Sequence, residues 1–267
     1  MSEISREFAE EILQIIEQQQ GSDVIDTALA LRMIDVAVQL GREDLVEKII
    51  SHASDVAVDD EEKGWVLFEK MKRDESEIDS LVTFAIEQEA NYPKLAAAVF
   101  HHAALLYLGR EELDDANTMA NRSMRLREQS KDKSGISFGL SLLSHIAKQQ
   151  EDWDTAELFS QRRLNMAQSE IERMEAIQDI AHIKATIGEL EIAMEMMQES
   201  LEIAEEIGDL DGVLVSRWGL ADLAEISNQP DEAMVQLSAV MTQMMESNIP
   251  VPAPLKERIS KLTEVVS

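Results

Sequence analysis

The chain has 267 residues, of which 53 are acidic and 24 basic, and its formal net charge at pH 7 is -29. This charge should repel nucleic-acid backbones and anionic membrane surfaces, and the lack of cysteine excludes disulfides and cysteine-ligated metals. Only 10 glycines and 5 prolines are present, whereas β-rich folds need turn residues far more often, so the composition predicts an all-α protein.

The first 20 residues carry several glutamates, where a signal peptide would have a basic start followed by a continuous apolar core. No apolar run approaches the roughly 18 residues that a membrane span requires. We therefore expect a cytoplasmic protein with no membrane partner.

Residues 1–92 show helical periodicity without a regular repeat. Apolar residues recur at helical spacing in three groups: Ile12, Ile15 and Ile16, then Leu29, Met33, Val36 and Ala37, then Leu45, Ile49 and Ile50. The segment Leu40–Leu45 (LGREDL) echoes Leu108–Leu113 (LGREEL) 68 residues later, a spacing that would suit two shorter repeats. We predict divergent helix pairs over 1–92.

From about residue 96 onward the sequence repeats itself. An alanine recurs three residues after an anchor position, and the alanines are 40, 37 and 40 residues apart: Ala116, Ala156, Ala193 and Ala233. Nine residues before the anchors Leu113, Trp153, Leu190 and Pro230 stand four further small residues: Ala104, Ser144, Ala181 and Ala221. Small residues at two sites that flank a turn allow two antiparallel helices to cross closely.

This register resembles the tetratricopeptide repeat, in its long form of about 40 residues that occurs in kinesin light chains and bacterial signalling regulators. Glu199–Asp209 and Leu126–Gly135 look like the second helix and inter-repeat turn of that family, and Gly188–Ala193 looks like the turn within a pair. The sequence departs from the pattern where the family favours glycine, at Glu111, Glu151 and Asn228. The resemblance implies a right-handed α-solenoid of antiparallel helix pairs, with four repeats over 93–250.

Two patterns that could indicate chemistry are better explained as helix. Gly135–Gly139 matches the nucleophile-elbow pattern G-x-S-x-G, but a polar helix end precedes it instead of the required buried strand. In the repeat register Ser137 opens a helix and Gly135 suits the inter-repeat turn. Asp59–Lys70 is no calcium loop, because lysines occupy two ligand positions. We predict no enzyme, no cofactor and no metal site.

The candidate binding residues follow from the resemblance, since the first helix of each pair lines the concave groove in that family. The groove positions eight and twelve residues before the anchors hold Leu105, His145, His182 and Asp222, and His101, Ser141, Gln178 and Trp218. The histidines are either half-buried helix residues or contacts to a ligand, and Trp218 is either a binding anchor or a core residue. Imidazole pKa values should be raised, if anything, in so acidic a protein, so binding of an acidic ligand should strengthen as the pH falls.

Two other surface features have two readings each. A basic stripe on the predicted second helices, at the convex side or edge, either pairs with neighbouring acids or docks an acidic partner: Arg122, Arg125, Arg127, Lys131, Arg162 and Arg163. Three methionines near the C-terminus either fill gaps in the core or form an adaptable binding surface: Met241, Met244 and Met245.

Prolines at 250, 252 and 254 must break the helix before them. Over 251–267 a last helix is expected to place four apolar residues on one face: Leu255, Ile259, Leu262 and Val266. Such a helix is either a cap on the exposed end of a solenoid or a detachable binding element.

The sequence therefore predicts a protein–protein interaction module, whose groove binds a peptide or helix of a partner protein. The alternative is a signalling regulator that senses a small ligand or short peptide. An enzyme is a distant third, since no nucleophile, base and orienting group occur together.

Overall fold

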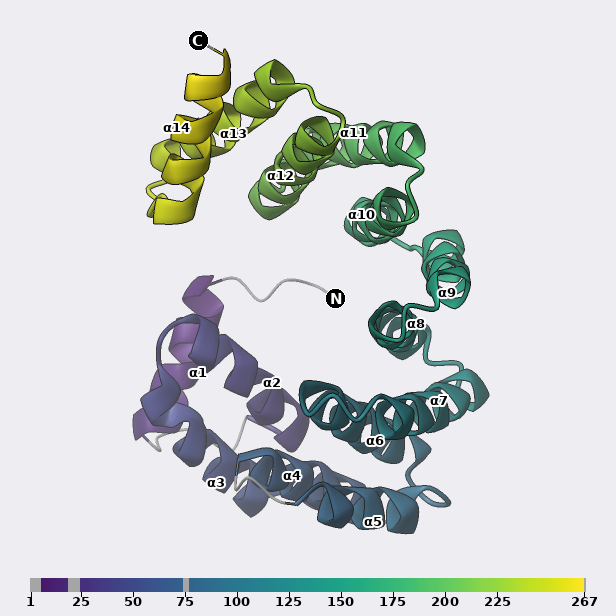
Figure 1. Ribbon diagram of the computed structural model, residues 1–267. Helices are drawn as coiled ribbons and strands as arrows, with labels where there is room; N and C mark the ends of the chain where they lie inside the picture. Colours follow the sequence, from purple (N-terminus) through teal and green to yellow (C-terminus); the bar gives the residue numbers. More distant parts are fainter. Residues whose placement is uncertain (1–5, 19–24, 74–76, 267) are drawn as a thin grey trace. The chain divides into compact units, whose positions relative to one another are not determined.

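The computed structural model describes residues 6–18, 25–73 and 77–266 (Figure 1). Helices account for 84% of these residues, and no strand occurs among them, which confirms the all-α prediction. None of the described helices has the length and apolarity needed to cross a bilayer. The chain forms two compact units, Met1–Asp132 and Lys133–Ser267. The predicted division into 1–92, 93–250 and 251–267 stays a prediction.

The first unit contains seven α-helices and a short 3₁₀-helix within the described residues: α1 (Arg6–Gln18), α2 (Thr27–Gln39), η2 (Glu43–Leu45), α3 (Val46–Val56), α4 (Asp60–Arg73), α5 (Ile78–Gln88), α6 (Pro93–Gly109) and α7 (Leu113–Gln129). One core lies between α1, α2 and α3, and a second core joins α4 to α7 around Leu95 and Phe100. The predicted apolar periodicity holds, because Ile12, Met33 and Ile49 are all buried.

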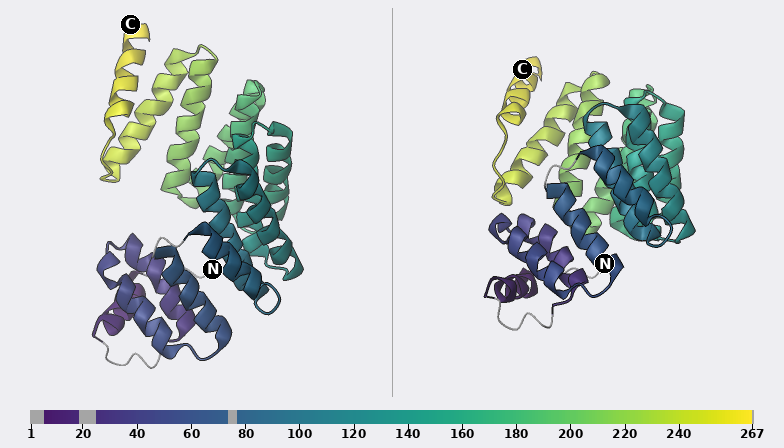
Figure 2. Two further views of the ribbon diagram at one scale, coloured as in Figure 1. Left: turned by 60° about the horizontal axis from the view of Figure 1, so that its bottom comes forward. Right: turned by 90° about the horizontal axis from the view of Figure 1, so that it is seen from below.

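The second unit contains α8 (Lys133–Gln149), α9 (Trp153–Met166), α10 (Glu170–Thr186), α11 (Leu190–Ile207), α12 (Leu210–Ile226), α13 (Pro230–Glu246) and α14 (Ala253–Val266). Each helix packs against the next along the chain, and α10 also contacts α12 (Figure 2). The unit is thus a stack of helix pairs, in which α8, α10 and α12 are the first helices and α9, α11 and α13 the second.

Small side chains set the crossing within each pair. The four alanines after the anchors and the four small residues before them are all at most 1% exposed, as expected of sites where paired helices approach closely. The serine among them also finds polar partners, since Ser144 Oγ lies 3.1 Å from the carbonyl oxygen of Ala156 and 2.8 Å from Ser160 Oγ. Larger residues at these sites would force the helices apart.

The turns end their helices in one recurring way. After α8, the amide of Glu151 donates to the Lys148 carbonyl and the amide of Asp152 to the Ala147 carbonyl, at 3.1 and 2.9 Å. This is the Schellman pattern, whose central residue takes a left-handed conformation. Glu151 has φ 57°, and Gly188 has φ 87° at the same place after α10. Glu111 and Asn228 have φ 62° and 55°, so all three departures from the glycine pattern are strained left-handed positions.

The structure corrects two assignments of turn residues. Gly135 lies inside α8, near its start, and the left-handed residue of that turn is Lys131, with φ 54°. The LGREDL and LGREEL segments are not equivalent either. Gly41 takes the left-handed place with φ 68°, whereas Gly109 is the last residue of α6 and Glu111 takes that place. Matching turns are therefore 70 residues apart, because helix termination and not glycine identity defines the register.

Helix starts use side-chain caps. Asp152 accepts from the Thr155 amide at 3.1 Å at the start of α9, and Asp209 accepts from the Gly212 amide at 2.9 Å at the start of α12. At the start of α10, Ser169 accepts from the Glu172 amide, while the Glu172 carboxylate accepts from the Gln168 amide. Each contact satisfies an amide that the helix leaves without a partner.

The C-terminal helix covers the end of the stack, as a cap would. Leu255 and Leu262 are buried against α12 and α13, and Ile259 packs beside them. The side chain of Val266 lies outside the described part of the structure.

The left-handed turns yield a stability prediction. Glu151→Gly should raise the free energy of unfolding by about 0.5–1 kcal/mol, because glycine removes the strain of a left-handed side chain. Gly188→Ala should lower it by about 1 kcal/mol for the same reason. Urea unfolding at pH 7 measures both. Gln149→Gly, inside the last turn of α8, is the control and should destabilise; an equal loss in Glu151→Gly would contradict the strain argument.

The crossing sites yield a second prediction. Ala181→Leu and Ala221→Leu should each lower the free energy of unfolding by about 1–3 kcal/mol, because both alanines are fully buried where helices cross. The exposed Glu195→Leu on α11 provides the matched control for added bulk. Thermal melts of both alanine variants that superimpose on the wild type would show that these sites are not crossings.

Candidate functional site

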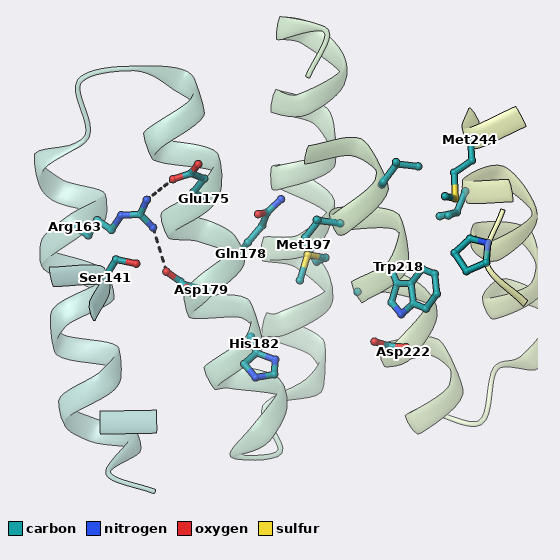
Figure 3. Close-up of a pocket in the computed structure, with 15 residues that line it drawn as sticks. Ser141, Arg163, Glu175, Gln178, Asp179, His182, Met197, Trp218, Asp222 and Met244 are labelled. Atoms are coloured by element: carbon teal, nitrogen blue, oxygen red, sulfur yellow. Dashed lines mark hydrogen bonds and ion pairs between the residues drawn. The ribbon is translucent and has the colours of Figure 1, made fainter. Parts of the chain in front are cut away.

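The second unit has a concave cavity of about 680 Å³ (Figure 3). Residues from α8 to α13 and the turn before α14 line it: Ser141, Arg163, Glu175, Gln178, Asp179, His182, Met197, Leu214, Val215, Trp218, Gly219, Asp222, Val240, Met244 and Pro252. The charged residues Arg163, Glu175 and Asp179 lie at one end, and Trp218 and Met244 at the other.

The cavity brings together five of the eight predicted groove residues: Ser141, Gln178, His182, Trp218 and Asp222. His145 is exposed on α8 but is not among the residues that line the cavity. His101 and Leu105 belong to α6 of the other unit, where His101 is half-buried and Leu105 is 45% exposed. That these residues bind a partner stays a prediction.

The apolar end is built around a close approach of α11 and α12. A Cβ atom at Gly219 would lie 2.7 Å from Met197 Cε, so glycine at this position lets the methionine lie flat along α12. Val215, one turn earlier on α12, is 52% exposed. Trp218 is half-buried and packs against the core, and Met244 packs there too. Tryptophan and methionine therefore contribute to the core and to the cavity wall at once, while Met245 is 63% exposed and fills no core gap.

The charged end depends on an arginine that the sequence register places elsewhere. The side chain of Arg163 is only 10% exposed and donates to Glu175 and, at 3.2 Å, to Asp179. Lys148 donates to the other oxygen of Asp179 at 3.1 Å. The prediction of a convex or edge position for Arg163 is therefore wrong, because its side chain lines the cavity.

The repeat register itself shows that Arg163 is unusual. It stands ten residues after its anchor, where the other pairs have Ser123, Ser200 and Val240, all of them buried. A long cation at a site that elsewhere holds a small or apolar buried residue must find carboxylates within reach. The carboxylates are Glu175 and Asp179 on the next first helix, α10.

The C-terminal helix contributes a second arginine near the apolar end. Arg258 of α14 lies with its guanidinium carbon 5.6 Å from the centre of the Trp218 ring. It also bonds to Asp222 at 2.5 Å and to Glu225 at 2.7 Å. Cation–π contact and paired carboxylates together fix the orientation of Trp218 beside the cavity.

Comparisons with known proteins give the fold. No model of a protein family matches the chain, and no curated protein matches it. Among solved structures, the chain resembles a signal transduction ATPase with numerous domains from Pyrococcus horikoshii, which has a tetratricopeptide repeat sensor (TM-score 0.64, 12% identity, 91% of this chain and 41% of that one). It also resembles BtubC from P. vanneervenii (TM-score 0.56, 15% identity, 92% and 94% of the chains). A putative kinesin light chain from Podosopora anserina with TPR-like repeats is similar as well (TM-score 0.54, 12% identity, 89% and 98% of the chains).

The fold is a TPR-like α-solenoid. This confirms the resemblance drawn from the repeat register, and identities of 12–15% support the fold alone. The pairs α8–α9, α10–α11 and α12–α13 are its TPR-like repeats in the second unit, and most residues that line the cavity belong to the first helices α10 and α12.

Two arginines of the basic stripe, on α7 of the first unit, pair with a neighbouring acid. Arg122 donates to Glu89 at 2.6 Å and Arg125 donates to the same carboxylate at 2.9 Å. Arg127 is buried on α7. Intramolecular pairing with Glu89 therefore accounts for Arg122 and Arg125.

The histidine pKa values move opposite to the prediction. Burial lowers the pKa of His101 to about 4, with Arg127 and His102 adding to the shift. Desolvation and the nearby Lys148 also lower the pKa of His145. Local burial and neighbouring cations outweigh the negative charge of the whole protein, so the expectation of raised imidazole pKa values is wrong at these two sites.

The two chemical patterns rejected in the sequence are helical. Ser137 lies within the second turn of α8, and Asp60–Lys70 lies within α4. No group of three or more potential metal ligands occurs in the described ranges.

The shifted imidazole gives a pH-dependent prediction. His101 stays neutral in the folded protein down to about pH 4, while the unfolded chain takes up a proton near 6.5. Acidification through this window should therefore favour unfolding at this site. Relative to the wild type, His101→Gln should gain stability as the pH falls from 7 to 4.5, measured by urea unfolding at several pH values. A stability difference that is the same at every pH would show that His101 protonates normally.

Proposed function

We propose that the chain is a protein-interaction module that binds a peptide or helix of a partner protein along the first helices of its TPR-like repeats. The observation that carries the proposal is the cavity, most of whose lining residues lie on the first helices α10 and α12. It joins half-exposed apolar side chains, Val215 and Trp218, to fixed polar groups on the neighbouring helices. Rigid side chains on packed helices lower the ordering cost of binding.

The polar network of the cavity supports recognition over catalysis. Gln178 donates to Ser216 at 3.1 Å, and Ser216 shares a hydrogen bond with Ser200 at 2.9 Å. Asp179 accepts from two cations, Lys148 and Arg163, which hold it in place. No hydrogen bond joins Ser141 and His182, both of which the structure describes. The hydrogen bonds and ion pairs of these side chains fix the shape of the cavity wall, and we propose no reaction.

A second candidate is a regulator that senses a small ligand or a short peptide. The cavity volume favours it, because about 300–1,000 Å³ is typical of sites for small molecules. The two candidates differ in how much surface the ligand covers. A protein segment should also contact residues outside the cavity, such as the 60% exposed Phe138 on α8, whereas a small ligand should not.

The test compares two valines of similar exposure. Val215 lines the cavity and is 52% exposed, and Val235 on α13 is 57% exposed and does not line it. After partners captured from the native host are identified, each is purified and its affinity measured by titration calorimetry. Val215→Asp should weaken the specific partner by more than about 2 kcal/mol, while Val235→Asp should leave the affinity unchanged. Both variants should fold, since neither valine is buried.

A double change gives an independent reading. Trp218→Ala with His182→Ala should also weaken the partner by more than about 2 kcal/mol while preserving the circular dichroism of the helices. Equal affinities of wild type, Val215→Asp and the double variant would rule out the cavity as the binding surface.

A further inference from the structure

The carboxylates of the cavity retain the capacity to bind another cation. Glu175 and Asp222 have side chains that are 47% and 49% exposed, although each already accepts from an arginine. A carboxylate offers about four lone-pair positions, so both can accept further donors. The cations that hold them are less accessible, since Arg163 is 10% exposed and Arg258 is 23% exposed. An incoming segment therefore meets carboxylate oxygens before it meets a guanidinium.

The charge of the surrounding unit acts in the same direction. Residues 133–267 include 24 acidic and 10 basic side chains, and this excess attracts cationic segments and repels acidic ones over several ångströms. An acidic segment would also have to separate Arg163 from Glu175 or Asp179. Because the Arg163 side chain is only 10% exposed and that of Asp179 25%, separating these two leaves poorly solvated charges without partners, which is costly.

The C-terminal helix shows this recognition chemistry within the chain itself. Arg258 lies beside the ring of Trp218, bonds to Asp222 and Glu225, and belongs to a helix whose leucines pack on α13. An arginine flanked by apolar residues is thus already bound to α12 at one end of the cavity. The cavity continues from there to Glu175 at its charged end.

We propose that the cavity binds a basic, apolar segment of a partner protein, in which a lysine or arginine lies near a bulky apolar side chain. The apolar side chain fills the space between Val215, Trp218 and Met244, and the cation donates to Glu175. This inference rests on the proposed function and specifies the chemistry of the partner. The proposed ligand is basic, whereas the ligand considered from the sequence is acidic.

The test begins with selection from a library of random twelve-residue peptides displayed on phage, with the full-length protein as target. Peptides that also bind Val215→Asp are removed. The peptides that remain should be enriched in lysine or arginine close to a large apolar residue and depleted in aspartate and glutamate. Enrichment of acidic or uncharged peptides would overturn the inference while leaving the proposed function intact. If no peptide depends on Val215, both fail.

A matched pair of glutamates then tests the contact directly. Glu199 has the same 47% side-chain exposure as Glu175 and also pairs with one arginine, Arg173, but it does not line the cavity. With the best selected peptide in fluorescence anisotropy, Glu175→Gln should raise Kd about 5- to 20-fold and Glu199→Gln less than about twofold. Raising the salt from 50 to 300 mM should weaken binding to the wild type more than to Glu175→Gln. Equal effects of the two glutamate changes would overturn the inference.

Discussion

The close crossing of paired helices at small residues is the constraint on which the rest of the structure depends. Alanine or serine at two sites per pair allows the backbones to approach closely, and this approach aligns the first helices beside one another. Side chains on α10 and α12 that are separated by a whole repeat in the sequence then line the same cavity. The shape of the cavity is therefore a consequence of how the paired helices pack.

The cavity combines two kinds of wall, each with its own physical origin. Its apolar wall arises because Trp218 and Met244 serve the core and the surface at once, and because Gly219 gives Met197 room against α12. Its polar wall arises because Arg163 occupies a site that is small or apolar in the other pairs and draws Glu175 and Asp179 toward it. In protein interfaces generally, apolar contact supplies affinity and fixed charges restrict which partners are compatible.

The sequence was sufficient to predict those features that depend on the periodic spacing of residues along the helices. The repeat register predicted the eight small sites and placed Gln178, His182, Trp218 and Asp222 on α10 and α12, whose side chains share the cavity. It missed Arg163, because a second helix was expected to face away from the groove and spacing alone does not report how far a long side chain reaches. It also gave the wrong direction for the pKa values of His101 and His145, since net charge describes the whole molecule and desolvation acts at the single ring. The cavity volume and the contacts of Arg258 depend on tertiary packing, which no local pattern encodes.

The turn at Asp152 has a consequence for how the stack comes apart. The amide of Asp152 donates to the Ala147 carbonyl at the end of α8, and its carboxylate accepts from the Thr155 amide at the start of α9. Fraying of one helix end therefore removes a partner from the other, so the two ends open together. Because only three residues separate α8 from α9, the turn is too short to accommodate an inserted residue without disturbing a helix end. Local opening in this part of the chain should thus involve whole helix pairs, and a ligand that spans α10 and α12 would couple neighbouring pairs into a larger cooperative unit.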